Sequence, residues 1–116
     1  AGRRYRGKNC KIMKVYISGR ISGLPSDQVS AKFEQAERQV IAAGHTPVSP
    51  LKNGLPGDAP WSEHMGRDIT MLLESDAVYR LADWAESQGA RIEYAAAVEY
   101  GMAILDQPDY AAYKPQ

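Results

Sequence analysis

Residues 76–105, DAVYRLADWAESQGARIEYAAAVEYGMAIL, contain the pattern that decides the fold. The first six, residues 76–81, are rich in β-favouring side chains and predict a strand, and residues 102–105 predict another. Between them, residues 89–101 predict an alanine-rich helix that ends at a glycine. A strand, a helix and a second strand at this spacing predict a right-handed unit in which the two strands run parallel.

The same alternation extends towards the N-terminus. Residues 14–18, KVYIS, predict a strand that stops at Gly19, and residues 45–49 predict a weaker strand that Pro47 assigns to a sheet edge. Two more helices are expected from apolar side chains at helical spacing. These side chains are Val29, Phe33, Ala36, Val40 and Ile41 in one helix, and Trp61, Met65, Ile69 and Leu72 in the other.

This order of elements predicts an α/β fold. We expect a small doubly wound parallel sheet of four to five strands, in a three-layer sandwich of the Rossmann or flavodoxin-like kind. In such sheets, ligands bind beyond the carboxyl ends of the strands. The loops at residues 19–25 and 82–89 are therefore expected to line a binding site.

The charge of the chain is unevenly distributed, although the formal net charge is zero. Residues 1–14 contain six of the 14 basic residues and no acidic residue. We interpret residues 1–12 as a basic leader, either a disordered tail or an artificial extension, and residues 13–116 as the domain. A nucleic-acid-binding arm is the alternative interpretation of the leader. Nucleic acid is not the partner that we expect.

Other sequence features limit the cellular locations and the cofactors that we expect. The single cysteine, Cys10, excludes an internal disulfide, and neither a signal peptide nor a membrane span is visible, so we expect a cytoplasmic protein that does not enter a membrane. The loop GRISG at residues 19–23 matches neither the Walker A pattern nor GxGxxG. His45 and His64 lack the spacing of metal ligands. We therefore predict no metal and no cofactor.

Asp68 is unusual because it shares the apolar stripe of its predicted helix. A carboxylate in that position is unfavourable unless it is paired, hydrogen-bonded or protonated. Asp68 could lie at the edge of the stripe and pair with Arg67, Arg20 or a backbone amide. It could equally be a functional acid, and the spacing leaves both interpretations open.

Glu93 is expected in the first turn of its helix, shortly after Ser87 and Gly89. Free N–H groups and partial positive charge at a helix start would keep a carboxylate ionised, which suits a nucleophile. An ordinary helix-start glutamate has the same placement, so both interpretations remain open. Glu86 and Glu99 are interpreted as solvated charges.

Polar groups near the predicted strand ends form a candidate anion site. Hydroxyl groups, guanidinium groups and free helix amides would converge there and could bind a phosphate. The residues concerned are Gly19, Arg20, Ser22, Ser87, Gly89 and Arg91. Tyr16, inside the first strand, is either a core residue or part of this site.

Three motifs, taken in order, resemble a known family. They are Lys14-Val-Tyr-Ile-Ser-Gly, then Arg67-Asp-Ile…Glu74-Ser-Asp-Ala-Val-Tyr, then Ser87-x-Gly-x-x-x-Glu93-Tyr-x-x-Ala. Over residues 13–105 the chain resembles the nucleoside 2-deoxyribosyltransferase-like superfamily, and most closely its small DUF4406-type domains.

The resemblance implies an enzyme that cleaves the N-glycosidic bond of a nucleoside or (deoxy)nucleoside 5′-monophosphate, by hydrolysis or base transfer. It implies that Glu93 is the nucleophile in a retaining double displacement, that Asp68 helps to protonate the departing base and that Tyr16 positions Glu93. Ser87 matches a serine that contacts the 5′-phosphate in nucleoside monophosphate N-glycosidases. The order of Arg20 and Ser22 is reversed relative to phosphate-handling relatives.

The resemblance also implies a homodimer or a larger homo-oligomer, because relatives complete their sites across an interface. The partner would then be a nucleoside or nucleotide together with further copies of the chain. The alternative is a non-catalytic nucleotide-binding or signalling module on the same fold.

Overall fold

The computed structural model describes residues 12–108, and in this range four parallel strands form one sheet. The spatial order of the strands is β2-β1-β3-β4. The strands are β1 (Lys14–Ser18), β2 (Thr46–Val48), β3 (Ala77–Arg80) and β4 (Ala103–Asp106). The parallel α/β sheet is confirmed, and β2 lies at an edge, where Pro47 can lack an N–H without breaking a central ladder.

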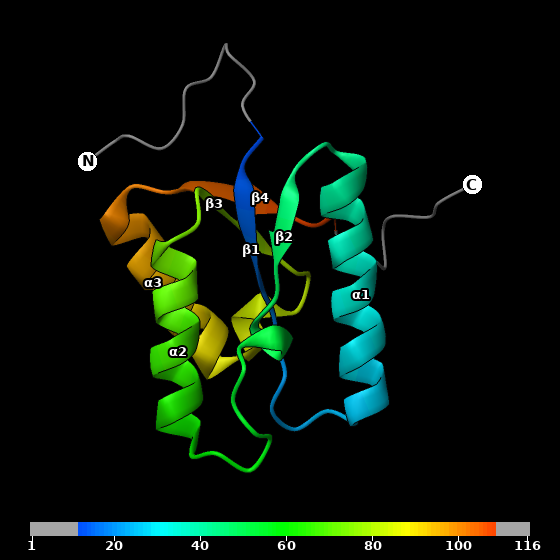
Figure 1. Cartoon of the computed structure of the whole chain (residues 1–116), viewed down its shortest axis with the longest axis vertical. Helices are drawn as coiled ribbons and strands as arrows, with labels where there is room; N and C mark the ends of the chain where they lie inside the picture. Colours follow the sequence, from blue (N-terminus) through cyan, green and yellow to red (C-terminus); the bar gives the residue numbers. More distant parts are fainter. Residues whose placement is uncertain (1–11, 109–116) are drawn as a thin grey trace.

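Helices cover both faces of the sheet (Figure 1). One face packs against α1 (Ser26–Ala42), and the other packs against α2 (Trp61–Leu73) and α3 (Gln88–Tyr100). Two short 3₁₀ helices, η2 (Pro50–Lys52) and η3 (Trp84–Glu86), lie in the loops before α2 and α3. The expected three-layer, doubly wound arrangement is therefore present.

The alternation of side chains along β1 divides the core into two layers. Val15 and Ile17 pack with the buried side chains of α1, whereas Tyr16 packs with Leu72 of α2 and Ala97 of α3. This is the two-residue period of a strand that is buried on both faces. Ser18, two residues after Tyr16, consequently lies on the same face as Tyr16.

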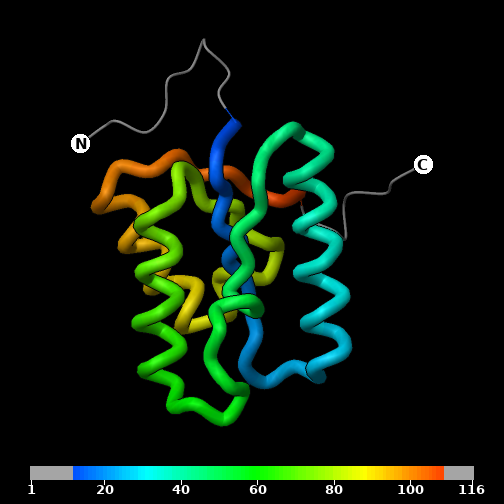
Figure 2. The backbone as a smooth tube through the Cα atoms, in the orientation of Figure 1, coloured from blue at the N-terminus to red at the C-terminus, as the bar shows by residue number. Residues whose placement is uncertain are grey.

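The strands share one direction, so the loops that follow them meet at one end of the sheet. In Figure 2 the segments after β1 and after β2 both leave the sheet at the lower end of the view, where the segment before α3 also lies. The parallel register is continuous, with Tyr16 paired to Val48 in β2 and to Val78 in β3. Because β1 is hydrogen-bonded to strands on both sides, the backbone that carries the residues at its end is held in place.

Two side chains expected in the core lie at the surface. Trp61 is 48% exposed, because it begins α2 at the end that overhangs the carboxyl edge of the sheet. Ile41 is 60% exposed in the last turn of α1. The element bounds also differ by one or two residues from the expected ones: α3 begins at Gln88, and β4 is Ala103–Asp106.

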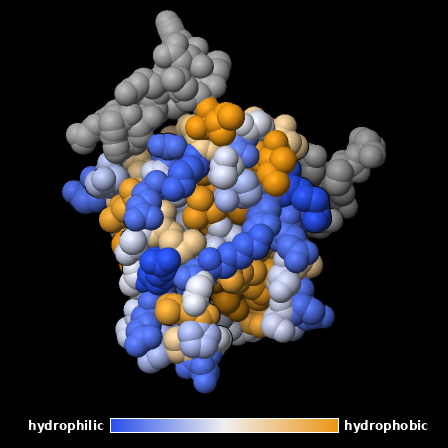
Figure 3. Space-filling model, in the orientation of Figure 1, coloured by the Kyte–Doolittle hydropathy of each residue, from blue (hydrophilic) through white to orange (hydrophobic). Residues whose placement is uncertain are grey.

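The expectations for the leader and the C-terminal end fall largely outside the described residues, which begin at Ile12 and end at residue 108. Among residues 12–108, no helix combines the length and the apolar character that crossing a membrane requires. The surface of the view in Figure 3 is mixed, with hydrophobic side chains gathered in its lower middle between hydrophilic ones.

Candidate active site

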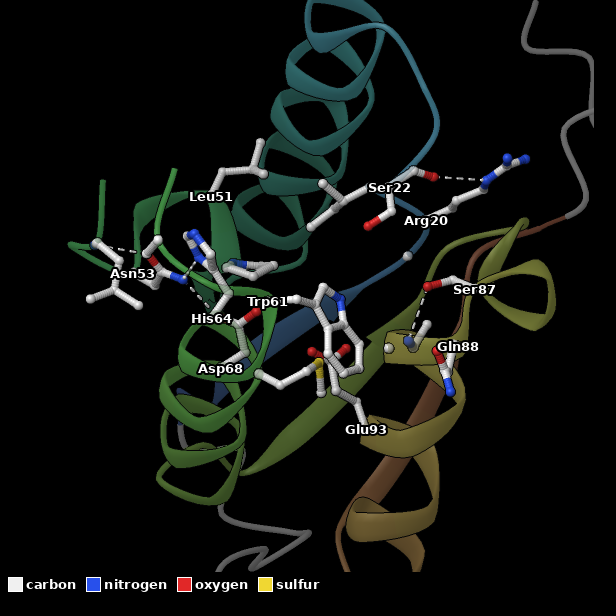
Figure 4. A pocket seen from close by; sticks show the side chains of 18 of the residues that line it. Arg20, Ser22, Leu51, Asn53, Trp61, His64, Asp68, Ser87, Gln88 and Glu93 are labelled. Atoms are coloured by element: carbon white, nitrogen blue, oxygen red, sulfur yellow. Dashed lines mark hydrogen bonds between the residues drawn. The ribbon is translucent and has the colours of Figure 1, made fainter. Parts of the chain in front are cut away.

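A cavity of about 680 Å³ lies at the carboxyl end of the sheet. Its walls come from the loops after β1 and β2, from the first turns of α2 and from the start of α3 (Figure 4). The loops at residues 19–25 and 82–89 contribute as expected for this fold. The loop after β2, residues 50–59, forms a third wall that the sequence did not indicate.

Glu93 lies in the wall of this cavity and is 5% exposed. The Tyr16 hydroxyl donates a hydrogen bond of 2.8 Å to its Oε2, and the Ser18 hydroxyl donates one of 2.6 Å to its Oε1. Each carboxylate oxygen is thus held by a hydroxyl group from β1. Tyr16 and Glu93 are thus in direct contact, and Ser18 is a second partner of Glu93.

The helix-start explanation for Glu93 is wrong. Since α3 begins at Gln88 and Ser87 is its N-cap, Glu93 lies in the second turn, beyond the free N–H groups. The pKa of Glu93 is raised to about 7: burial is the largest cause, the hydrogen bonds from Ser18 and Tyr16 oppose it, and the nearby charge of Asp68 adds to it. The carboxylate is therefore stabilised by hydroxyl groups and not by the helix dipole.

Asp68 is 6% exposed and lines the same cavity. The two arginines considered as its partners are wrong: Arg67 donates to the backbone carbonyl of Asn53, and Arg20 pairs with Glu86. The Asn53 side chain instead donates a 2.9 Å hydrogen bond to Asp68 Oδ1. Burial raises the pKa of Asp68, against the opposing effects of Asn53 and His64.

Asn53 is a buried residue that joins the loop after β2 to the site. Its Nδ2 lies 3.0 Å from His64 Nδ1 and 2.9 Å from Asp68 Oδ1, and its Oδ1 accepts from the backbone N–H of Leu55. Because the amide nitrogen is only a donor, His64 Nδ1 must be the acceptor, and His64 Nε2 then donates to the carbonyl of Pro56.

The start of α3 forms the opposite end of the cavity. The Ser87 hydroxyl accepts from the N–H of Ala90, as an N-cap does, and its own proton remains available to a ligand. Gly89 faces α2 closely, because a Cβ at this position would lie 3.2 Å from Met65 Sδ and 3.8 Å from Trp61 Cζ2. Ser87 and Gly89 both line the cavity.

The loop after β1 brings Gly19, Arg20 and Ser22 to the cavity. Gly19 has no room for a side chain, since its Cβ would lie 2.7 Å from Leu81 Cδ1. Arg20 Nη1 lies 3.7 Å from a carboxylate oxygen of Glu86, whose side chain is 69% exposed. Glu86 is solvated as expected, but it also lies at the cavity.

A half-buried ion pair fixes this loop. Lys32 of α1 donates to Asp83 Oδ2 at 2.5 Å and to the carbonyl oxygen of Arg20 at 2.6 Å. The second carboxylate oxygen of Asp83 accepts from the N–H of Arg20. The loop after β1 and the loop after β3 are therefore tied to each other and to α1.

Arg91 lies outside the cavity. Its Nη1 donates to the carbonyl oxygen of Ala85, and its side chain is exposed. The helix turns Arg91 away from the site because it is two residues from Glu93, about 200° around the axis. Arg91 therefore does not line the cavity with Ser87 and Gly89.

The sequence analysis did not identify three residues of the site, although the spacing of two of them in the sequence indicates where they lie. Ser18 follows Tyr16 by two residues on a strand, so both lie on one face. His64 precedes Asp68 by four residues on a helix and so lies beside it. Asn53 lies in an irregular loop, and no spacing rule connects it with Asp68.

No group of three or more His, Cys, Asp or Glu side chains in residues 12–108 is arranged to hold a metal ion. The groups assembled around the cavity are two buried carboxyl groups, a tyrosine, a serine and an asparagine. The carboxyl groups can accept and release protons, and a carboxylate can attack an electrophilic carbon.

Known proteins share this fold. A protein-family model described as "Domain of unknown function (DUF4406)" matches residues 13–106. The structure is similar to that of a 2-desoxiribosyltransferase from Leishmania mexicana, with a TM-score of 0.63 and 20% sequence identity, over 80% of this chain and 62% of that chain.

A second similar structure is that of 2-deoxyribosyltransferase from the psychrotolerant bacterium Bacillus psychrosaccharolyticus. The TM-score is 0.62 and the identity 19%, over 80% of this chain and 70% of that chain. At these identities the likeness establishes the fold. Among curated protein sequences, none matches this chain.

Proposed function

The chain belongs to the DUF4406 family, and we propose that it cleaves the N-glycosidic bond of a nucleoside or nucleoside 5′-monophosphate. The proposal is supported by the family, by the fold shared with deoxyribosyltransferases and by the cavity. The observation that supports this most is the presence of two buried carboxyl groups, Glu93 and Asp68, in the wall of one cavity. Buried carboxyl groups with raised pKa values at a cavity are typical of catalytic sites.

In the proposed reaction, a carboxylate oxygen of Glu93 attacks the anomeric carbon of the sugar. A carbon–oxygen bond forms, the carbon–nitrogen bond breaks, and its electron pair leaves with the base, which takes a proton from Asp68. Water, or a second base, then attacks the same carbon and releases the Glu93 carboxylate. A proton from the attacking water, or from the N–H of the attacking base, returns to Asp68.

The two carboxyl groups must start in different protonation states, with Glu93 ionised and Asp68 protonated. Burial favours the protonated form of both, and the charge of Asp68 makes ionisation of Glu93 less favourable. The hydroxyl groups of Tyr16 and Ser18 favour the ionised form of Glu93. The pair is therefore suited to holding one proton between them.

The cavity has two chemically different ends, and Glu93 lies between them (Figure 4). We assign the base to the end that contains Asp68 and Asn53, because the departing nitrogen must reach the acid. The 5′ end of the sugar then lies at the start of α3, near Ser87. Hydroxyl groups and helix N–H groups there can bind a 5′-hydroxyl or a 5′-phosphate.

The proposal is tested by incubating the protein with a panel of ribo- and deoxyribonucleosides and their 5′-monophosphates, followed by chromatography for free base. A second base is added in parallel to detect transfer. We expect base release that Glu93→Gln and Glu93→Ala abolish, and that Asp68→Asn reduces strongly.

Asp68→Asn preserves the acceptor for Asn53, so its folding is checked against the wild type by thermal unfolding. Release of no free base by the wild type from any compound of the panel would contradict the proposal. If a nucleotide then raised the melting temperature without turnover, the non-catalytic nucleotide-binding module would be the better description.

The assembly and the location remain predictions. We expect a homodimer or larger homo-oligomer, and light scattering at several protein concentrations measures its mass. A cytoplasmic location is expected from the sequence and is tested by fractionation.

A further inference from the structure

Ser18 is the buried serine that ends β1, and its side chain is directed at Glu93. It is 1% exposed, and its hydroxyl lies 2.6 Å from Glu93 Oε1, closer than the Tyr16 hydroxyl lies to Oε2. A hydroxyl–carboxylate distance in this range is typical of a charge-assisted hydrogen bond. Tyr16 and Ser18 therefore donate hydrogen bonds to the two oxygens of one carboxylate.

We propose that Ser18 is a positioning residue for Glu93, which fixes the plane of the carboxylate and stabilises its charge for attack on the sugar. This inference rests on the proposed function of Glu93 as the nucleophile. Ser18 acts through Glu93 and is not assigned a contact with the substrate.

The geometry of β1 explains why two hydroxyl groups can hold one carboxylate. Tyr16 and Ser18 lie two residues apart on one face of a strand that is paired on both sides, and Ser18 is in register with Arg80 of β3. Two anchored donors restrict rotation of the carboxylate about its last bond. Each oxygen has two lone-pair directions, so one bound hydroxyl leaves the other direction for the substrate.

The surroundings of Glu93 make these uncharged donors important. The titratable groups that face Glu93 are Tyr16 from β1 and Asp68 from α2, and Asp68 opposes ionisation of Glu93. Within residues 12–108, no Lys, Arg or His forms an ion pair with Glu93. Hydroxyl groups stabilise the negative charge without neutralising it, and the carboxylate therefore remains a nucleophile.

The first test follows the ionisation of Glu93 and needs no turnover. The side-chain carboxyl carbon of Glu93 is followed by ¹³C NMR between pH 4 and 10, and its signal is assigned by its loss in Glu93→Gln. We expect Ser18→Ala to raise the titration midpoint by about one pKa unit. Ser18→Cys, which preserves most of the volume and a weaker donor, should give a smaller rise.

Ser75→Ala is the matched control. Ser75 is also buried, and its hydroxyl donates to the carbonyl of Met71, away from Glu93. Its removal should leave the midpoint of Glu93 where it is in the wild type. If Ser18→Ala, or Ser18→Cys should the alanine variant not fold, titrates with the wild-type midpoint, the proposal is overturned.

The second test measures base release against pH. A one-unit rise in the Glu93 midpoint lowers the ionised fraction at pH 6 about tenfold and has little effect at pH 9. We therefore expect kcat of Ser18→Ala to fall about tenfold more at pH 6 than at pH 9, with a smaller change in KM. An equal fall at both pH values would contradict the positioning role.

The two tests separate this inference from the proposed function. If the wild type releases no base, the proposed function fails, while the NMR titration still shows whether Ser18 stabilises the Glu93 carboxylate. If the wild type is active and the Glu93 midpoint does not respond to Ser18, only the inference about Ser18 fails.

Discussion

Tyr16 and Glu93 lie 77 positions apart in the sequence and are joined by a buried 2.8 Å hydrogen bond. This bond connects a central strand to α3 beside the cavity that Glu93 lines. Burial raises the pKa of the Tyr16 hydroxyl well above its ordinary value, and the Glu93 charge raises it further, so Tyr16 remains a donor at every physiological pH. Changes at Tyr16 or Glu93 are therefore expected to alter both the activity and the pH dependence of stability.

Tyr16→Phe removes this donor and leaves the ring in place. We expect kcat for base release to fall about tenfold or more, because a hydrogen bond to a charged group is lost. The rising limb of the pH profile should also move to higher pH. Tyr79→Phe is the control, since the Tyr79 hydroxyl donates to Gln39 outside the cavity. Equal losses in both variants would argue against a role for Tyr16 at Glu93.

Glu93→Gln should make the protein more stable at pH 8 than the wild type. The pKa of Glu93 is raised from 4.5 to about 7 in the folded state, so the folded protein retains a proton that the unfolded chain releases between these pH values. The stabilising effect of this proton is complete below pH 4.5 and is lost as the pH rises through 7. Glutamine does not titrate and avoids this loss.

Denaturant unfolding at pH 4 and pH 8 measures the difference. The glutamine variant should gain up to about 3 kcal/mol relative to the wild type between these pH values. Glu99→Gln, an exposed substitution on the same helix, should show almost no such gain. A pH-independent difference for Glu93→Gln would mean that its carboxyl group titrates normally.

Glu86→Gln should change the preference for a 5′-phosphate. Glu86 lies at the cavity beside Arg20, where its negative charge opposes a phosphate and its ion pair occupies the guanidinium group. We expect the ratio of kcat/KM for a nucleoside monophosphate to kcat/KM for the nucleoside to rise about fivefold. Arg20→Gln should lower this ratio, and Glu99→Gln should leave it unchanged. A fall of the ratio in Glu86→Gln would contradict this assignment.

Gly19→Ala should destabilise the fold by about 1–3 kcal/mol, because the added methyl group meets the Leu81 side chain at 2.7 Å. Gly66→Ala is the comparison, since a Cβ on this exposed helical glycine meets nothing within 4 Å. That variant should gain about 0.5–1 kcal/mol from helix propensity. Chemical denaturation of both variants tests the close approach of β1 and Leu81.

The local patterns of the sequence were sufficient for the strands and helices, because strand and helix periods are short-range properties. Glu93 was assigned to the correct helix, but a helix start one residue earlier and an N-cap at Ser87 moved it out of the first turn. Asn53 could not be predicted, since its contact with Asp68 depends on the path of an irregular loop. Trp61 was assigned to the core because helical spacing does not show where a helix overhangs the sheet.

The bonds of Lys32 to Asp83 and to the carbonyl of Arg20 have a consequence for the thermodynamics of binding. They order the loop after β1 before any ligand arrives, so the conformational entropy of that loop is lost during folding and not during binding. A substrate that enters between Arg20 and Ser87 meets a preformed surface. Its affinity then reflects its contacts with the cavity, without a penalty for ordering this loop.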